Sequence, residues 1–312
     1  MGEPLRYSPV VVFAYRRSKH LALAIDALLK NPEARRTPLY VFCDGPKDAH
    51  FAPDVDRVRD VVSSIRGFAS VRVVLRDKNF GLARNIIEGV SDVLREHDSV
   101  IVVEDDIVVS PYFLRFMNAA LSCYEDTRRV GSISGYCYPL KGEWPETFFI
   151  RGADCWGWAT WRDRWALFNP NGGQLLQELS ASGMIDAFDY GGAMQYSKML
   201  EDQISGKNDS WAVRWHASCF LRDLLALYPS RSLVKNIGLD GTGTHGVGAD
   251  ESYDVNVSNR PVSVGGIPIV ESSAARDAFR QFFVGGQRET GNQPAKKLRR
   301  SLSALVARLR VH

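Results

Sequence analysis

The sequence has no apolar stretch as long as a membrane-spanning helix and no large excess of either charge. The apolar run near its start, 9–14, has six residues, whereas a helix that crosses a bilayer needs roughly 20. This run is also too short for the apolar part of a secretory signal peptide. The formal net charge of +3 is too small to indicate nucleic-acid binding. We therefore expect no membrane span, no export signal and no nucleic-acid partner.

Cysteine is scarce as well. The five cysteines are an odd number, they are widely spaced, and none belongs to a C-x-x-C pair. They are Cys43, Cys123, Cys137, Cys155 and Cys219. This pattern favours buried free thiols in a reducing compartment, so we expect a cytoplasmic protein.

The chain does have enough apolar sequence for a full core, since 45% of its 312 residues are hydrophobic. Apolar runs of strand length occur at 9–14, 39–43, 71–75 and 99–103. Segments with helical periodicity alternate with them at 21–29, 55–65 and 82–95. Strands that are apolar on both faces and separated by helices indicate an α/β fold with a mostly parallel central sheet, covered by helices on both faces.

Beyond Tyr112 the periodicity is less regular. Helices are expected near 113–124 and 211–225, with an aromatic segment at 155–161 between them. We interpret 1–285 as a single domain made of two halves, 1–109 and 110–285. The remaining residues, 286–312, read as a polar linker followed by a basic amphipathic tail.

Polar residues follow three of the predicted strands. Arg16 and Arg17 come after the first run, Asp44 after the second, and three carboxylates after the run 99–103. In open parallel sheets the ligand crevice lies outside the carboxyl ends of the strands. We therefore expect these side chains to lie around one crevice.

The three carboxylates are those of Glu104, Asp105 and Asp106. At a dry strand end they would repel one another, and Mg²⁺ or Mn²⁺ neutralises such a group most directly, often with a diphosphate as shared ligand. The alternative is a solvated acidic turn, or a cap for a helix that begins near Ser110-Pro111. The buried strand that precedes them favours the metal site.

Five segments resemble those of glycosyltransferases with the GT-A fold, in the order in which that family has them. They are PVVVFAYRR at 9–17, FCDG at 42–45, NFGLARN at 79–85, VEDDI at 103–107 and CWGW at 155–158. The sequence is similar above all to bacterial family 2-like sugar transferases and to the N-acetylglucosaminyltransferase that begins complex N-glycans. The resemblance covers roughly 8–250, and it implies a Rossmann-like nucleotide-binding half (1–109) and an acceptor half (110–285).

The resemblance implies roles for the residues after the first two strands. In that family an arginine after the first strand binds the nucleotide of the donor, which points to Arg17, with Arg16 as the other option. The acid after the second strand contacts the base of the nucleotide, which points to Asp44. The alternatives are surface arginines paired with acids and a plain turn at Asp44-Gly45-Pro46.

The resemblance also implies three roles within the acidic segment. Asp106 corresponds to the direct metal ligand, and Glu104 and Asp105 to residues that face the ribose and the donor sugar. Gly81 and Arg84 correspond to the element beside the donor, where glycine permits close approach of the backbone and arginine meets the diphosphate or sugar. A helix-start turn with an exposed Arg84 is the alternative.

An inverting transfer needs a base that takes the proton of the acceptor hydroxyl. The family places this carboxylate in a short acidic motif before a tryptophan, which points to Asp209 in KNDSW at 207–211. Asp209 could instead cap the following helix. The competing candidate for the base is Asp154, which precedes the CWGW segment.

The acceptor half contains two further kinds of candidate. Trp156 and Trp158 could stack on sugar rings, and we expect one tryptophan of this segment to line the site and the others to pack in the core. His245 lies in the glycine-rich segment GTGTHG at 241–246, where the resemblance implies a ligand that completes the metal shell. A lone histidine of this kind is otherwise unligated.

Basic and apolar residues alternate between 296 and 310 with the spacing of an amphipathic helix. Such a helix is able to lie on the anionic cytoplasmic face of a membrane, where lipid-linked acceptors reside. The alternative is a solvated terminal tail.

These observations predict a glycosyltransferase that depends on Mn²⁺ or Mg²⁺. We expect it to move a hexosyl or N-acetylhexosaminyl group from a UDP-linked donor to a glycan or lipid-linked acceptor. The expected product belongs to a bacterial cell-surface polysaccharide. A sugar nucleotidyltransferase is the first alternative, although such enzymes carry a glycine-rich loop after the first strand and 15–18 has no glycine. An inactive relative that binds carbohydrate or nucleotide is the second.

Overall fold

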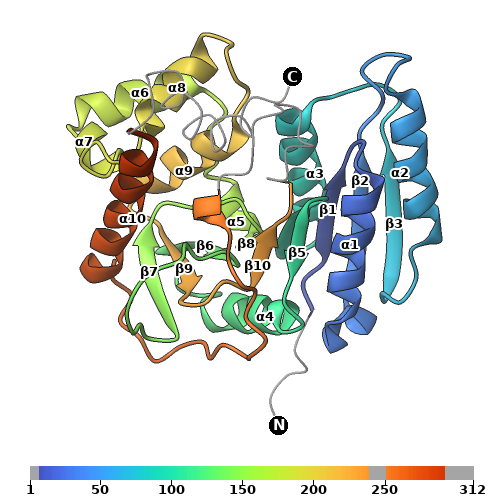
Figure 1. Ribbon diagram of the computed structural model, residues 1–312, viewed down its shortest axis with the longest axis horizontal. Coiled ribbons are helices and arrows are strands. Elements are labelled where there is room, and N and C mark those ends of the chain that lie inside the picture. The colour runs from blue at the N-terminus through green and yellow to red at the C-terminus, as the bar shows by residue number, and fades with distance from the viewer. Residues whose placement is uncertain (1–6, 239–250, 292–312) are drawn as a thin grey trace.

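The computed structural model describes residues 7–238 and 251–291 and shows an α/β fold (Figure 1). In this part of the chain an eight-stranded sheet has the strand order β3-β2-β1-β4-β8-β6-β9-β7. Its strands are β1 Val10–Ala14, β2 Pro38–Cys43, β3 Ser70–Leu75, β4 Ser99–Glu104, β6 Val130–Ser134, β7 Thr147–Arg151, β8 Trp158–Trp161 and β9 Leu225–Pro229. β7 and β8 are antiparallel to their neighbours, and the other strands share one direction. The predicted α/β class with a mostly parallel central sheet is confirmed.

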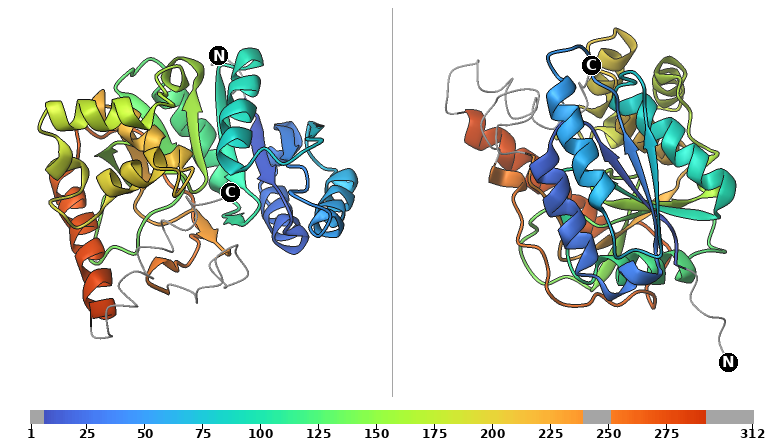
Figure 2. Two further views of the ribbon diagram at one scale, coloured as in Figure 1. Left: turned by 90° about the horizontal axis from the view of Figure 1, so that it is seen from above. Right: turned by 90° about the vertical axis from the view of Figure 1, so that its right-hand side faces the viewer.

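Helices cover both faces of this sheet. Val10 and Val12 of β1 belong to the hydrophobic core that also contains residues of α1, α2 and α4, whereas Val11 and Phe13 belong to a second core with residues of α3 and α9. Figure 2 shows α3 on the opposite side of these strands from α1 and α2. The helices are α1 Ser18–Leu29, η1 Pro32–Arg36, α2 Ala52–Ser64, α3 Leu82–Glu96, α4 Phe113–Cys123, α5 Arg162–Trp165, α6 Gly172–Ala181, α7 Ile185–Phe188, α8 Tyr196–Ile204, α9 Trp211–Leu221, η2 Glu251–Tyr253 and α10 Ser273–Gly291.

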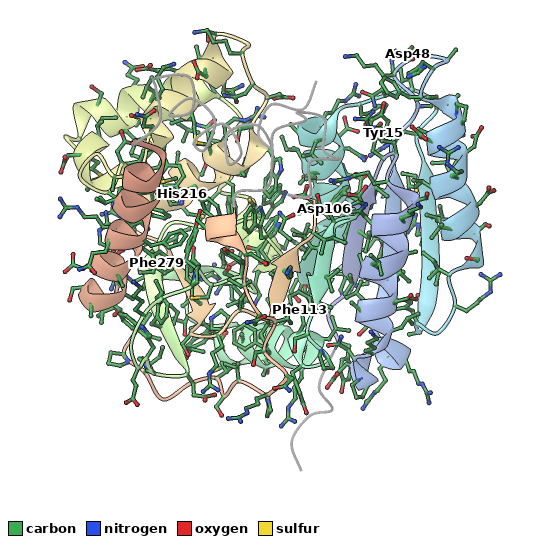
Figure 3. All side chains as sticks on the ribbon, viewed as in Figure 1. Tyr15, Asp48, Asp106, Phe113, His216 and Phe279 are labelled. Atoms are coloured by element: carbon green, nitrogen blue, oxygen red, sulfur yellow. The ribbon has the colours of Figure 1, made fainter. Side chains whose placement is uncertain are left out.

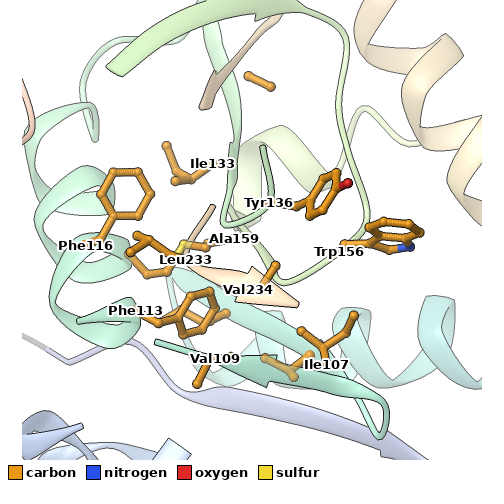
Figure 4. Close-up of a cluster of buried hydrophobic side chains, with 14 of the residues drawn as sticks. Ile107, Val109, Phe113, Phe116, Ile133, Tyr136, Trp156, Ala159, Leu233 and Val234 are labelled. Atoms are coloured by element: carbon orange, nitrogen blue, oxygen red, sulfur yellow. The ribbon is translucent and has the colours of Figure 1, made fainter. Parts of the chain in front are cut away.

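A second, two-stranded sheet lies directly after the acidic residues. β5 (Ile107–Val109) pairs antiparallel with β10 (Val234–Asn236), and the Ile237 N–H donates to the Asp106 carbonyl at 2.9 Å. Ile107 and Val234 pack in the same hydrophobic cluster as Phe113 and Trp156 (Figure 4). The second half of the chain therefore supports the turn that carries the acidic residues.

The central sheet crosses the boundary between the two halves of the chain. β4, from the first half, pairs with β8, from the second, through Ser99 to Val102 and Trp158 to Trp161. Hydrogen bonds and a shared core thus join 1–109 to the residues that follow. In the described residues no helix is long and apolar enough to cross a membrane.

Several expectations differ from the structure. The helix predicted near 211–225 ends at Leu221, because the chain turns at Asp223 (φ 55°) and Leu225 begins β9. β3 is a strand as predicted, but it lies at the sheet edge and leaves Val73 39% and Leu75 49% exposed, so helices do not cover it on both faces. The predicted linker begins within α10, which continues to Gly291. His245 and 292–312 lie outside the described residues.

All five cysteines are free thiols, as the sequence predicts. Cys43, Cys137 and Cys219 are buried, Cys155 is partly exposed, and Cys123 is exposed, so the expectation of burial is wrong for Cys123. Burial raises the pKa of the Cys43 thiol to about 12. This thiol is therefore protonated and unreactive at neutral pH.

Candidate functional site

The carboxyl ends of β1, β2 and β4 meet at one edge of the sheet. β1 lies between the other two, with Phe13 opposite Glu104 and Ala14 opposite Cys43. Just past the strands, the Asp105 N–H donates to the Phe13 carbonyl at 3.0 Å and the Asp44 N–H donates to the Ala14 carbonyl at 2.9 Å. The structure thus brings the polar residues that follow three separate strands to one place.

Arg17 connects the acidic residues to the first strand. Its Nη2 lies 2.5 Å from Oδ1 of Asp105 and 2.5 Å from Oδ2 of Asp106, whose side chains are only 6% and 1% exposed. The backbone N–H of Tyr15 adds a long bond to Asp105 Oδ2 at 3.4 Å. One guanidinium therefore neutralises part of the charge of two buried carboxylates. Figure 3 labels Tyr15 and Asp106 in this region.

Glu104, Asp105 and Asp106, called the acidic turn below, do not cap a helix. Glu104 ends β4 and is partly exposed, and the other two form the turn between β4 and β5. The helix that follows, α4, begins at Phe113, and its N-cap residue is Tyr112. The alternative interpretation of the acidic residues as a helix cap is therefore excluded.

Asp44 holds the loop that precedes α3. Its carboxylate accepts the N–H groups of Gly45, Phe80 and Gly81 and the side-chain amide of Asn79, at 2.7 to 3.1 Å. Burial raises the pKa of Asp44, and these hydrogen bonds oppose the rise. Because four donors fill the acceptor capacity of a carboxylate, a nucleotide base can bond to Asp44 only if one of these bonds opens.

Gly81 and Arg84 lie at the start of α3, next to this loop, whereas Arg16 follows β1. Gly81 is the N-cap of α3 with φ 76°, and a Cβ there would meet no atom within 4 Å. Its backbone angle, rather than crowding, therefore accounts for the glycine. Arg84 is exposed, pairs with Glu88 at 2.7 Å and lies over the Phe80 ring. Arg16 lies over the ring of Phe51, the residue before α2.

Within the described residues, the acidic turn would hold a divalent metal only together with a ligand. Among the residues that the structure describes, no three His, Cys, Asp or Glu side chains form a metal-binding group. Mg²⁺ is commonly held by one or two carboxylates together with substrate phosphates, rather than by protein alone. Asp105 and Asp106 match this partial kind of site.

An aromatic pocket of about 700 Å³, which includes the space at its mouth, lies in the second half. We call it the aromatic pocket; its walls include Tyr138, Asp154, Trp156, Tyr190, Tyr196, His216 and Tyr228. Small-molecule sites are likewise mostly apolar with a few polar groups.

Asp154 is the carboxylate of the aromatic pocket. Its Oδ1 accepts the N–H groups of Cys155 at 2.6 Å and Trp156 at 3.4 Å, and its Oδ2 accepts the hydroxyls of Tyr138 and Tyr228, both at 3.4 Å. Burial raises the pKa of Asp154, and the hydrogen bonds oppose this. The bonds to Oδ2 are longer than ordinary O–H···O bonds, so this oxygen can accept a proton from a ligand.

His216 was not singled out from the sequence. It lies on α9, is 7% exposed and lines the aromatic pocket, with its Nδ1 bonded to the backbone of Ala153. Burial lowers its pKa to about 4, so the imidazole is neutral at pH 7. Figure 3 labels it on the side of the molecule that also carries Phe279. The sequence of its helix, WAVRWHASCFL, is largely apolar. A single histidine in such a helix is expected to be a core residue, so the sequence did not indicate that His216 lines a pocket.

The two predicted acceptor-side tryptophans have different surroundings. Trp156 lines the aromatic pocket and packs against Tyr136 (Figure 4). Trp158 is completely buried in the core on the other face of the sheet, where it packs against Trp211 and Trp215. Trp158 therefore has no surface that an acceptor can reach, and it is one of the tryptophans expected to pack in the core.

Asp209 lies outside the aromatic pocket. Its side chain is 48% exposed and pairs with Arg214 at 2.9 Å. The cap of α9 is the neighbouring Ser210, whose hydroxyl accepts the Val213 N–H. Asp209 is therefore a surface carboxylate beside the start of α9 and does not cap that helix through its side chain.

The aromatic pocket adjoins the acidic turn. The last residues that pair between β4 and β8 are Val102 and Trp158. Glu104 lies two residues after Val102 and Trp156 lies two residues before Trp158, so the antiparallel register places both at the same end of this strand pair. The pKa of the Cys155 thiol is raised first by burial and then by the negative charges of Asp154 and Glu104, which therefore both lie near it.

The sequence matches no protein-family model and no curated protein. Among solved structures, the chain is similar to the mannosyltransferase PcManGT from Pyrobaculum calidifontis in complex with GDP-Man and Mn²⁺, with a TM-score of 0.30 and 18% identity. That match covers 41% of this chain and only 35% of the other.

Two further solved structures are similar to a comparable extent. A UDP-glucose pyrophosphorylase complexed with UDP-glucose has a TM-score of 0.31 and 13% identity, over 52% of this chain and 79% of that one. The galactosyltransferase LgtC, in complex with donor and acceptor sugar analogues, has a TM-score of 0.33 and 12% identity, over 54% and 64%. What this chain does has to be inferred from its own residues.

Proposed function

We propose that this protein is a glycosyltransferase that moves a sugar from a nucleotide-sugar donor to a hydroxyl group of a glycan or lipid-linked acceptor. The observation that carries the proposal is the position of the acidic turn, which joins Arg17 at the carboxyl end of β1 and adjoins the aromatic pocket. A site for a diphosphate and a site for a sugar ring are then neighbours, as a transfer reaction requires.

The donor would lie along the carboxyl ends of β1, β2 and β4. Asp106 and Asp105 would hold Mn²⁺ or Mg²⁺ together with the diphosphate, and the metal would offset the charge that builds on the leaving group. By the resemblance to GT-A enzymes, Glu104 would face the ribose or the sugar, and Arg17 would turn from the carboxylates to the phosphates. His245 remains a predicted further ligand.

The acceptor would enter the aromatic pocket, where Asp154 would act as the base. Its Oδ2 would take the proton of an acceptor hydroxyl as that oxygen attacks the anomeric carbon and the bond to the diphosphate breaks, which inverts the configuration. Asp154 suits this role better than Asp209, because Asp154 lines the pocket and has a raised pKa whereas Asp209 is exposed and paired with Arg214.

The finer points of the proposal come from the sequence. They are a UDP-linked hexosyl or N-acetylhexosaminyl donor, a role in bacterial cell-surface polysaccharide synthesis, and a cytoplasmic site of action with membrane contact through the basic tail. The nucleotidyltransferase alternative is less favoured because β1 is followed by Tyr15, Arg16 and Arg17, and the next residue, Ser18, already begins α1. This leaves no room for a glycine-rich phosphate loop.

A thermal-shift panel of nucleotides and nucleotide sugars, with and without Mn²⁺, tests the donor site. We expect a nucleoside diphosphate or its sugar conjugate to raise the melting temperature in the presence of Mn²⁺, because a ligand that binds only the folded state stabilises it. The shift should disappear in Asp106→Asn and persist in Asp92→Asn, which removes an exposed carboxylate paired with Arg95. No shift with any nucleotide would contradict the proposal.

A further inference from the structure

We propose that the aromatic pocket selects an uncharged sugar ring of the acceptor and that Nε2 of His216 forms a hydrogen bond with one of its hydroxyl groups. This inference rests on the proposed function for the role of the ring as acceptor. The binding of the ring itself stands on the pocket alone.

The first step concerns the hydrogen bonds of His216. Its Nδ1 lies 3.1 Å from the N–H and 2.9 Å from the carbonyl oxygen of Ala153, so one ring nitrogen is engaged in either tautomer. The other, Nε2, is buried and has no hydrogen-bond partner among the residues that the structure describes. Buried polar atoms in folded proteins are nearly always hydrogen-bonded, and His216 lines the aromatic pocket, so a group that enters this pocket is the natural partner of Nε2.

The second step concerns the chemical group that fits Nε2. The imidazole is neutral, so Nε2 is a donor when Nδ1 accepts from Ala153 and an acceptor when Nδ1 donates to it. A hydroxyl group both donates and accepts and therefore satisfies either tautomer. An ammonium group only donates and satisfies one of them.

The third step concerns the remaining walls of the pocket. Trp156, Tyr190 and Tyr196 supply aromatic surface, and Oδ2 of Asp154 holds only two long bonds from tyrosine hydroxyls. A sugar ring offers apolar C–H faces to aromatic rings and hydroxyl groups at its edge. Its hydroxyls would meet two separate polar positions, Asp154 and His216, which fixes the orientation of the ring.

The fourth step concerns the alternative ligand. A cage of aromatic rings with a carboxylate also suits a cation such as a quaternary ammonium group. That ligand has no hydroxyl group, so it would leave Nε2 of His216 without a hydrogen-bond partner. The observations therefore favour the uncharged ring.

The test measures binding of simple ligands to the full chain by titration calorimetry and by NMR saturation transfer. The probes are the methyl glycosides of glucose, galactose, mannose and N-acetylglucosamine, with tetramethylammonium and glucosamine as cationic probes. We expect at least one neutral glycoside to bind with a millimolar dissociation constant, and the cationic probes to bind more weakly. Binding of none of the neutral glycosides, or tighter binding of tetramethylammonium, would overturn the inference.

Three variants assign the effect to Nε2. An asparagine amide can replace Nδ1 and its bond to Ala153 but does not reach the position of Nε2, whereas a glutamine amide reaches that position. We expect His216→Asn to weaken the glycoside about tenfold, the loss of one hydrogen bond, and His216→Gln to bind more tightly than His216→Asn. His97→Asn, which alters a histidine bonded to Tyr40, should bind like the wild type.

The same variants separate this inference from the proposed function. Each variant is first checked by circular dichroism and melting temperature, and the nucleotide thermal shift with Mn²⁺ is then measured. A glycoside affinity that depends on His216 without any nucleotide shift would retain the ring site and reject glycosyl transfer. A normal nucleotide shift with glycoside binding unchanged in His216→Asn would reject the ring site and retain the donor site.

Discussion

At the scale of single residues, Arg17 decides how the acidic turn can exist in the absence of a donor. Asp105 and Asp106 are almost completely buried, and their like charges would repel without the guanidinium 2.5 Å from each of them. A divalent ion could replace that positive charge when a donor brings its phosphates. In that case Arg17 would stabilise the fold without a donor and would become available to the phosphates when a donor binds.

Arg17→Gln should lower the free energy of unfolding by about 1 to 3 kcal/mol, less than the loss for a fully buried ion pair because the Arg17 side chain is 24% exposed. Because Mn²⁺ can replace the missing charge, it should raise the melting temperature of the variant more than that of the wild type. Calorimetric scans with and without Mn²⁺ measure both effects. Equal Mn²⁺ shifts in the two proteins would show that the metal does not bind at these carboxylates.

His216 should make the stability depend on pH. Burial lowers its pKa from 6.5 to about 4. Above pH 6.5 the histidine is neutral in both the folded and the unfolded state. Between pH 6.5 and about 4 only the unfolded chain binds the proton, so the free energy of unfolding decreases as the pH is lowered, by up to about 3 kcal/mol. His216→Phe removes this loss. Urea unfolding at pH 7, 6 and 5 should show the wild type losing more stability than the variant, and parallel pH profiles would contradict a buried neutral His216.

At the scale of elements, the loop before α3 depends on Asp44. Asp44→Asn turns one acceptor oxygen into a donor that faces the N–H donors of the loop, which should cost about 1 to 3 kcal/mol. Asp48→Asn is the matched control, because Asp48 is exposed and its carboxylate accepts the His50 N–H; we expect a change below about 0.5 kcal/mol. Chemical denaturation of both variants measures the difference. Equal losses would mean that Asp44 does not hold the loop.

The elements of the first half could be predicted because each strand is a continuous apolar run. β1, β2 and β4 form adjacent central strands, so their periodicity and their polar ends are visible in the sequence. β3 (SVRVVL) is also rich in apolar residues, but it contains Arg72 and lies at the edge, and strand order cannot be read from such a run. The predicted end of the helix at 211–225 was wrong for a similar reason. Leu225 and the residues after it are apolar, and apolar residues are as compatible with a buried strand as with a helix.

The residues of the aromatic pocket could not be predicted together. The Tyr228 hydroxyl and the Ala153 backbone meet Asp154 and His216 across sequence separations of 74 and 63 residues. Trp156 and Trp158 lie two residues apart, yet one lines the pocket and the other packs in the opposite core. The residue between them, Gly157, has φ 61°, and this turn of the backbone directs the two side chains to opposite faces of the sheet.

At the scale of the whole molecule, the shared sheet should make the two halves unfold together. All seven tryptophans lie after residue 143, so their fluorescence reports only on the second half. Val12→Ala changes a completely buried residue of β1 and should destabilise the protein by about 1 to 3 kcal/mol. We expect tryptophan fluorescence and far-ultraviolet circular dichroism to shift by the same amount in urea. A fluorescence midpoint that stays unchanged would show that the halves unfold independently.

The central claim is that a nucleotide sugar is cleaved at the acidic turn and that its sugar passes to a ligand in the aromatic pocket. The most direct measurement is to incubate the protein with Mn²⁺, a panel of nucleotide sugars and candidate glycan acceptors, and to identify the products by mass spectrometry. We predict a nucleoside diphosphate and a glycosylated acceptor, lost in Asp106→Asn, reduced at least about 100-fold in Asp154→Asn, as expected for a general base, and retained in Asp209→Asn. Release of pyrophosphate from a nucleoside triphosphate and a sugar phosphate, or full activity of Asp106→Asn, would contradict the account.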